Sequence, residues 1–174
     1  MENKIKNNLK IDKRIRAVFG EVELGSVTSS PASTREGIMA DQESEEAKQG
    51  RAILEMVNNA AHYKEVVPST GLLTSTKEFI SDPDGNTIKI QYIRPDTEEK
   101  LPCVYYIHGG GMMVSSCFDE LYAAWGRCIA RQGVAVAMVD FRNAMWASSA
   151  PEVEPYPAGP VSYTHLTLPT NIGV

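Results

Sequence analysis

A histidine and three glycines end an apolar run in the segment VYYIHGGGMMVSS, which begins at Val104. Glycine loses more conformational freedom on folding than any other residue, so three in succession need a reason. Successive backbone N–H groups of such a loop can point into one concavity that holds negative charge. His108, Gly109, Gly110 and Gly111 are therefore the first candidate site residues.

Three interpretations of this segment are compared: a phosphate-binding loop, a plain tight turn and an oxyanion hole. A phosphate-binding loop would follow G-x-G-x-x-G or end in Gly-Lys-Ser/Thr, and neither spacing is present here. A plain tight turn seldom needs three glycines. An oxyanion hole fits best, because an HGGG loop supplies backbone N–H donors to the developing charge on a carbonyl oxygen in lipases and esterases.

The surrounding pattern predicts the elements that position this loop. Two strands joined by a turn at 82–85 indicate an antiparallel hairpin. A third strand, a helix and a fourth strand then follow, and this order predicts a parallel right-handed crossover. The predicted strands are 74–80, 87–94, 101–107 and 134–139, and the helix is 118–132, with Leu121, Trp125, Cys128 and Ile129 at helical spacing.

These elements give an α/β fold class. Runs that are apolar on both faces belong to a sheet with helices on both sides. The glycines follow the third strand directly, and open α/β sheets bind ligands at the carboxyl ends of their strands.

The first seventy residues are predicted to be mainly helical. A short amphipathic helix lies within 1–20 and a loop within 20–31, and a stronger helix opens at Ser44 with Glu45 and Glu46 in its acidic first turn. The residues predicted to form its buried face are Ile53, Leu54, Val57, Ala60 and Ala61. His62 follows that face and is interpreted as structural or exposed.

Composition restricts the class of protein. A chain of 174 residues, 43% hydrophobic and 22% charged, suits one soluble domain, and a net charge of -5 argues against a nucleic-acid partner. Cys103, Cys117 and Cys128 lack metal-ligand spacing and predict free thiols in a reducing compartment. No run is long enough to span a membrane and no secretory signal is evident, so a cytoplasmic location is expected. No metal or organic cofactor is implied.

Residues 74–158 resemble the N-terminal half of an α/β-hydrolase sheet, in the hormone-sensitive-lipase-like esterase and lipase family. Three ordered motifs carry this resemblance: 108–111 matches the HGGG motif, 140–144 is similar to Asp-Tyr-Arg-x-Ala, and 156–158 is similar to aromatic-Pro-Ala. Residues 1–70 correspond to the helical lid of that family. The segment 145–153 departs from the family pattern.

The resemblance implies a serine esterase that acts on a small ester through an acyl-enzyme. The N–H groups of Gly110 and Gly111 would be the oxyanion donors. Gly109 would permit the turn, and His108 would brace the loop by hydrogen bonding.

Four further residues receive expected roles. Asp140 and Arg142 are expected to fix the loop through a salt bridge rather than to perform chemistry. Trp146 and Met112 either line an acyl pocket or pack ordinarily.

The family's nucleophile is a serine in G-x-S-x-G, and the sequence contains no such motif. The serines at 115, 116, 148 and 149 lack the flanking glycines. His165 lies in a segment, 160–174, that resembles translated sequencing-adapter sequence and is interpreted as a non-native tail; the alternative is a divergent natural C-terminus.

Three regions are therefore expected: a helical segment over 1–70, a partial α/β-hydrolase domain over 71–159, and the tail over 160–174. The chain itself is expected to be inactive. A non-catalytic hydrolase-like protein that binds a small ligand is the alternative function.

The resemblance also predicts an exposed edge. In the hydrolase fold the third strand lies between the fourth and the fifth, so residues 104–107 would form an apolar edge with unpaired backbone groups. Such an edge is a template for aggregation. A poorly soluble polypeptide is expected; the oligomeric state, the acyl chain length and the alcohol stay open.

Overall fold

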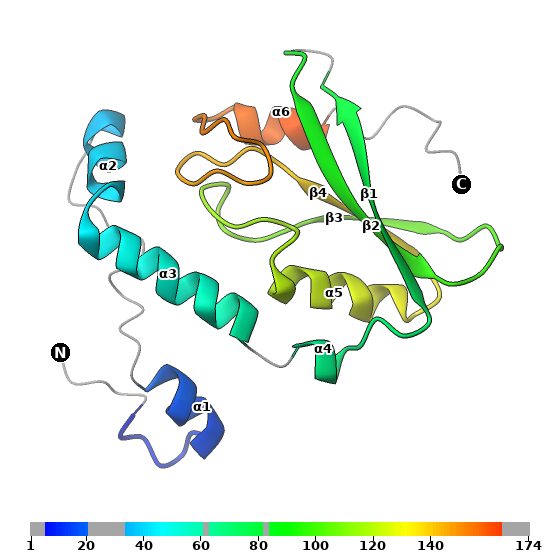
Figure 1. The fold of residues 1–174 in the computed structure, drawn as a ribbon, viewed down its shortest axis with the longest axis horizontal. Helices are drawn as coiled ribbons and strands as arrows, with labels where there is room; N and C mark the ends of the chain where they lie inside the picture. Colours follow the sequence, from blue (N-terminus) through cyan, green and yellow to red (C-terminus); the bar gives the residue numbers. More distant parts are fainter. Residues whose placement is uncertain (1–5, 21–33, 61–62, 82–83, 165–174) are drawn as a thin grey trace. The chain divides into compact units, whose positions relative to one another are not determined.

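The computed structural model describes residues 6–20, 34–60, 63–81 and 84–164 (Figure 1). The chain forms two compact units, residues 1–55 and 56–174, and each is described by itself. The loop predicted within 20–31 falls almost wholly outside the described residues, as do His62 and His165.

The first unit is helical, as predicted. It contains α1 (Lys13–Phe19), α2 (Arg35–Gln42) and the greater part of α3 (Glu45–Ala60). Ser44 accepts a hydrogen bond from the Ala47 N–H at 3.1 Å, which confirms the predicted start of α3. Sequence analysis did not predict α2, which Thr34 caps through a bond from the Gly37 N–H at 3.2 Å.

One prediction for α3 is wrong. Ile53, placed on the buried face by its spacing, is exposed, and Leu54 is half-buried. Helical periodicity identifies an apolar face but does not say which surface covers it, so burial along α3 was not determined by spacing.

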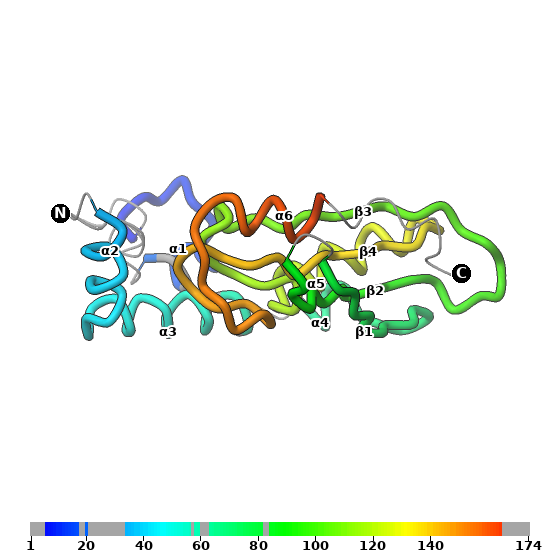
Figure 2. The backbone as a smooth tube through the Cα atoms, turned by 90° about the horizontal axis from the view of Figure 1, so that it is seen from above, coloured from blue at the N-terminus to red at the C-terminus, as the bar shows by residue number. Residues whose placement is uncertain are grey.

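The second unit is built on a four-stranded sheet. Its elements in chain order are α4 (Tyr63–Val66), β1 (Leu72–Ile80), β2 (Thr87–Pro95), β3 (Cys103–Ile107), α5 (Glu120–Ala130), β4 (Ala135–Asp140) and α6 (Ala158–Thr164). The strand order is β1-β2-β4-β3, with β3 at one margin and β1 at the other (Figure 2). β1 pairs antiparallel with β2, and β3 pairs parallel with β4, so the predicted hairpin and the predicted parallel pairing across the helix are confirmed.

Helices cover both faces of this sheet. α5 packs against β2 and β4 on the face that carries Ile93 and Met138. Tyr163 of α6 packs on the opposite face, against Ile88 and Val139 (Figure 1). All six residues of β4 are buried, which explains why its sequence is an almost unbroken apolar run.

The side of α5 that faces the sheet consists of small residues. Ala123, Ala124, Gly126 and Ala130 are buried, whereas Trp125 is 55% exposed. A Cβ atom on Gly126 would lie 2.4 Å from the Met138 sulfur, so the helix approaches the sheet too closely for a side chain there. Of the large apolar residues noted in the sequence, Ile129 packs against this core, whereas Trp125 lies away from it.

The helix α6 includes the first residues of the predicted tail. It runs from Ala158 to Thr164, and Ser162 is fully buried within it. Ser162 and Tyr163 of this segment are therefore packed in this structure, whereas Thr164 is exposed. The non-native origin of 160–174 stays a prediction.

The strand β3 is the outermost strand on its side of the described sheet, as expected. Val104 is 37% and Ile107 44% exposed, and Cys103 is also exposed. In the part of the chain that the structure describes, no helix has the length and apolarity needed to cross a membrane.

Candidate active site

The glycine loop leaves the carboxyl end of β3 with an unusual backbone. Gly110 and Gly111 adopt φ values of 110° and 66°, and the non-glycine residues Met112 and Ser115 also have positive φ, 59° and 78°. Positive φ is strained for residues with a Cβ atom. The loop therefore depends on its surroundings to keep this conformation.

Gly110 cannot carry a side chain in this loop. Its carbonyl accepts from the N–H groups of Met113 at 3.1 Å and Val114 at 3.3 Å, which folds the chain into a tight turn. A Cβ atom built on Gly110 would lie 2.1 Å from the Val114 carbonyl oxygen. The close approach of two backbone segments is thus one physical reason for a glycine here.

The backbone N–H groups of Gly110 and Gly111, the two expected oxyanion donors, make no hydrogen bond within the described part of the chain. Among the described residues, the hydrogen bonds donated within this loop come from other N–H groups, and none comes from Gly110 or Gly111. Unpaired backbone N–H groups in a glycine-rich turn are the donors that an oxyanion needs.

His108 is a buried support of the loop. Its Nδ1 atom lies 2.7 Å from the Gly109 carbonyl oxygen, which can only accept, so Nδ1 carries the proton. The ring stacks on Phe141 with centroids 4.2 Å apart. Burial lowers the pKa of His108, so the ring is neutral at pH 7, although its Nε2 atom lies 3.8 Å from Asp140.

Asp140, the last residue of β4, joins two loops. Its Oδ1 atom accepts from the Ser116 hydroxyl at 2.7 Å and from the Cys117 N–H at 2.9 Å. Its Oδ2 atom accepts from the Ser149 N–H at 2.6 Å. A buried carboxylate with three donors therefore fastens the end of the glycine loop to the segment after β4.

Asn143 holds the strained part of the glycine loop. Its side-chain amide donates to the Ser115 carbonyl at 2.6 Å. Alongside it, the N–H groups of Ala144 and Trp146 donate to the carbonyls of Met112 and Met113 at 2.9 and 3.0 Å. Asn143 was missed in the sequence because it fills the variable position of the Asp-Phe-Arg-Asn-Ala motif.

The expected salt bridge between Asp140 and Arg142 is not formed. Arg142 lies one residue beyond the end of β4 and pairs instead with Asp84 at 2.6 Å and Glu154 at 3.0 Å. Its Nε atom donates to the Ser162 hydroxyl at 3.0 Å. Residues i and i+2 of a strand share a face, but β4 ends at Asp140, so this alternation does not extend to Arg142 and the two side chains contact different loops.

Met112 and Trp146 connect the loops through their main chains. The side chain of Met112 is 40% exposed and its sulfur lies 4.0 Å from the Tyr163 hydroxyl. Trp146 is half-buried. These contacts join the loops that follow β3 and β4; whether the two side chains line an acyl pocket or only pack stays a prediction.

The described serines near the loop do not resemble an activated nucleophile. Ser116 donates to a carboxylate, Asp140, and Ser148 donates to the Phe141 carbonyl at 3.0 Å. Neither hydroxyl donates to an imidazole, the partner that activates a serine in a catalytic triad. Among the described residues, no group of three metal-binding side chains is present either.

Comparison with known proteins shows that the chain is similar to solved esterase structures. No family model matches the chain. The structure of esterase Est22 superposes with a TM-score of 0.81 at 52% identity, covering 91% of this chain and 46% of that one. A structure of Est22 with p-nitrophenol gives a TM-score of 0.78 at 50% identity, over 90% and 45% of the two chains.

The chain has an α/β-hydrolase fold, which it shares with these esterase structures. A brefeldin A esterase, described as a bacterial homologue of human hormone-sensitive lipase, shares this hydrolase fold with a TM-score of 0.56 at 24% identity, over 88% of this chain and 42% of that one. Gut esterase 1 of Caenorhabditis elegans is 35% identical over 65 residues, which is 37% of this chain and 12% of that protein. The chain thus spans less than half the length of these relatives.

Proposed function

We propose that this chain carries the oxyanion-hole half of a carboxylic-ester hydrolase. The observation that carries the proposal is the loop after β3, where Gly110 and Gly111 keep unused N–H groups in a turn that admits no Cβ at Gly110. Two donors aimed at a carbonyl oxygen would stabilise the tetrahedral intermediate of acyl transfer.

The roles of the surrounding residues follow from their contacts. Gly109 precedes the turn, and a Cβ there would lie 3.0 Å from the Tyr122 hydroxyl, so a small residue fits best. His108 braces the loop as a buried neutral ring and does not act as the general base. The full reaction needs a serine, an acid and a second histidine, which we propose are not supplied by this chain.

The chain alone is expected to be inactive. Without a nucleophile in G-x-S-x-G it cannot form the acyl-enzyme, and the oxyanion donors by themselves provide only a residual rate. Hydrolysis of p-nitrophenyl acetate by the purified chain should not exceed the buffer blank. Turnover above the blank would contradict the missing nucleophile.

A chimera tests the oxyanion loop directly. Residues 71–159 of this chain would replace the matching part of Est22, which is similar enough in backbone to accept them. The chimera should hydrolyse p-nitrophenyl acetate. A chimera that folds with native secondary structure but has no activity would reject the proposed role of this loop.

A second candidate function rests on the absence of G-x-S-x-G. A hydrolase-like protein that binds a small ligand without cleaving it would use the same loop and pocket. The reading frame downstream of codon 159 separates the two: G-x-S-x-G followed by Asp and His favours the enzyme, and a substituted serine favours the binding protein.

A further inference from the structure

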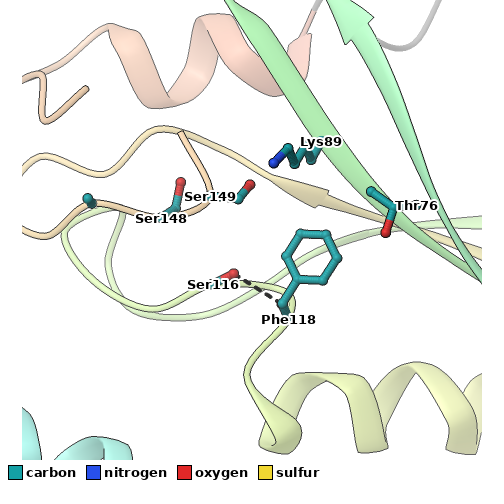
Figure 3. Close-up of a pocket in the computed structure, with 7 residues that line it drawn as sticks. Thr76, Lys89, Ser116, Phe118, Ser148 and Ser149 are labelled. Carbon is teal, nitrogen blue, oxygen red and sulfur yellow. Dashed lines mark hydrogen bonds between the residues drawn. The ribbon is translucent and has the colours of Figure 1, made fainter. Parts of the chain in front are cut away.

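A pocket of about 460 Å³ is lined by residues other than Gly110 and Gly111 (Figure 3). Thr76 of β1 and Lys89 of β2 form one wall. The segments 116–118 and 147–149 form the rest, through Ser116, Phe118, Ala147, Ser148 and Ser149. The volume falls within the range of small-molecule sites, roughly 300–1,000 Å³.

The ammonium of Lys89 is the charge that lines this pocket. Glu78 on β1 and Asp140 on β4 stand opposite Lys89 in the strand register, yet among the described residues no carboxylate lies within 4.0 Å of its Nζ atom. Glu78 is exposed to solvent, where its charge is screened. The positive charge of Lys89 therefore lacks a close partner.

Asp140 is directed to other donors. Both of its oxygens accept hydrogen bonds from Ser116, Cys117 and Ser149, as described above. Figure 3 shows the amino end of Lys89 pointing toward Ser148 and Ser149. A ligand anion between Lys89 and these serines would pair with the Lys89 ammonium, because the Asp140 carboxylate is engaged by other donors.

One hydroxyl at this position has unused hydrogen-bonding capacity. The Oγ atom of Ser149 is buried and has no hydrogen-bond partner, whereas the hydroxyls of Ser116 and Ser148 are both engaged. A buried hydroxyl without a partner is costly. Rotation about the Cα–Cβ bond of Ser149 would let the hydroxyl donate to an anion held by Lys89.

The remaining wall is apolar and aromatic. The ring of Phe118 lies between Lys89, Thr76 and Ser116 in the close-up (Figure 3), and the Ala147 methyl group completes this side. An aromatic ring offers an offset-stacking surface to another ring. The pocket thus combines one cation, one free hydroxyl and one aromatic face.

We propose that this pocket binds a small aromatic carboxylate, with the carboxylate between Lys89 and Ser149 and the ring against Phe118. The site does not use the N–H groups of Gly110 and Gly111. It is independent of the ester-hydrolase proposal, because binding requires no nucleophile.

Ligand-observed NMR with benzoate, at a low micromolar concentration of the chain, tests the site. Benzoate should show saturable binding, and benzamide, which has the same ring without the charge, should bind at least tenfold more weakly. Lys89→Met should weaken benzoate binding about tenfold to a hundredfold, the effect of losing a hydrogen bond to a charged group. Ser149→Ala should weaken it by a smaller factor, about threefold to tenfold.

Lys77→Met is the matched control. Lys77 lies on the same hairpin, opposite Ile90 on the other face of the sheet, and its removal changes the net charge equally. Benzoate binding should be unchanged in this variant. The proposal is overturned if benzoate does not bind, if benzamide binds equally well, or if Lys77→Met weakens binding as much as Lys89→Met while both variants keep the wild-type circular dichroism spectrum.

Discussion

At the scale of single residues, one close backbone contact explains why the glycine loop has a glycine at position 110. Both Gly110 and Gly111 have a positive φ. A Cβ atom added to Gly110 would lie 2.1 Å from the Val114 carbonyl oxygen, whereas one added to Gly111 would have the Met113 Cε atom as its nearest neighbour, at 3.4 Å. The two glycines therefore differ in what a methyl group would cost.

Gly110→Ala should be the more damaging change. We expect a loss of roughly 2–4 kcal/mol in the free energy of unfolding, because the new Cβ forces the turn open. Gly111→Ala should lose only about 1–2 kcal/mol, the cost of a left-handed conformation. Urea denaturation of both variants measures the difference, and equal losses would contradict the assigned contact.

Residue-scale burial of His108 also predicts a pH dependence. Burial lowers its pKa in the folded chain, so at acidic pH the unfolded chain binds a proton that the folded chain does not. The free energy of unfolding should therefore fall as pH decreases from about 7.5 to 5.5.

His108→Gln is the comparison for this effect. The variant retains His62 and His165, so any contribution of those residues to the slope is common to both proteins. Its unfolding free energy should depend less on pH over the same interval, as measured by urea denaturation at several pH values. A wild-type slope of the opposite sign would exclude a buried neutral His108.

At the scale of elements, Arg142 joins parts of the chain that are distant in sequence. Its guanidinium contacts Asp84 in the β1–β2 turn, Glu154 after β4, and Ser162 in α6. The guanidinium is 1% exposed, whereas its partners Asp84 and Glu154 are 30% and 45% exposed, so only the Arg142 side of these contacts is shielded from water. The planar guanidinium supplies several donors in fixed directions, which an ammonium does not.

Arg142→Lys should consequently cost roughly 2–4 kcal/mol of stability despite the retained charge. Ser162→Ala should cost about 1–2 kcal/mol, since it leaves the Arg142 Nε donor without that partner. Thermal and urea unfolding test both. If Ser162→Ala does not change the free energy of unfolding, α6 is not packed as described, and this result would support a non-native tail that begins at residue 160.

At the scale of the whole molecule, the exposed β3 margin is the feature with the largest expected consequence. Residues 103–107 carry no charge, and Val104 and Ile107 are exposed on an edge strand. Sheet edges of this kind pair with other chains, whereas charged residues on an edge oppose such pairing.

Val104→Lys should shift the chain toward the monomer. The wild type is expected to associate as concentration rises, and the variant should show less association in sedimentation velocity at equal concentration. Ser75→Lys, on the opposite margin β1, is the control and should leave association unchanged. Association that is equal in wild type and Val104→Lys would remove β3 as the contact.

The sequence by itself determined the order of the sheet elements and the position of the glycine loop. Local signals suffice for these features: Asp82–Gly85 specifies the turn, the apolar run before Asp140 specifies a strand covered on both faces, and Gly133, with a φ of 85°, ends the preceding helix. Each depends on neighbours in the chain, so each can be recognised without a structure.

Only the tertiary structure decided which side chains hold that loop. Asp140 meets Ser116 across 24 positions, and Asn143 meets Ser115 across 28, so their partners depend on how the strands and loops come together. The same reason explains why the helical spacing of Ile53 and Trp125 did not predict that both side chains are exposed. Periodicity records which residues share a face, whereas burial is a property of the surface that meets it.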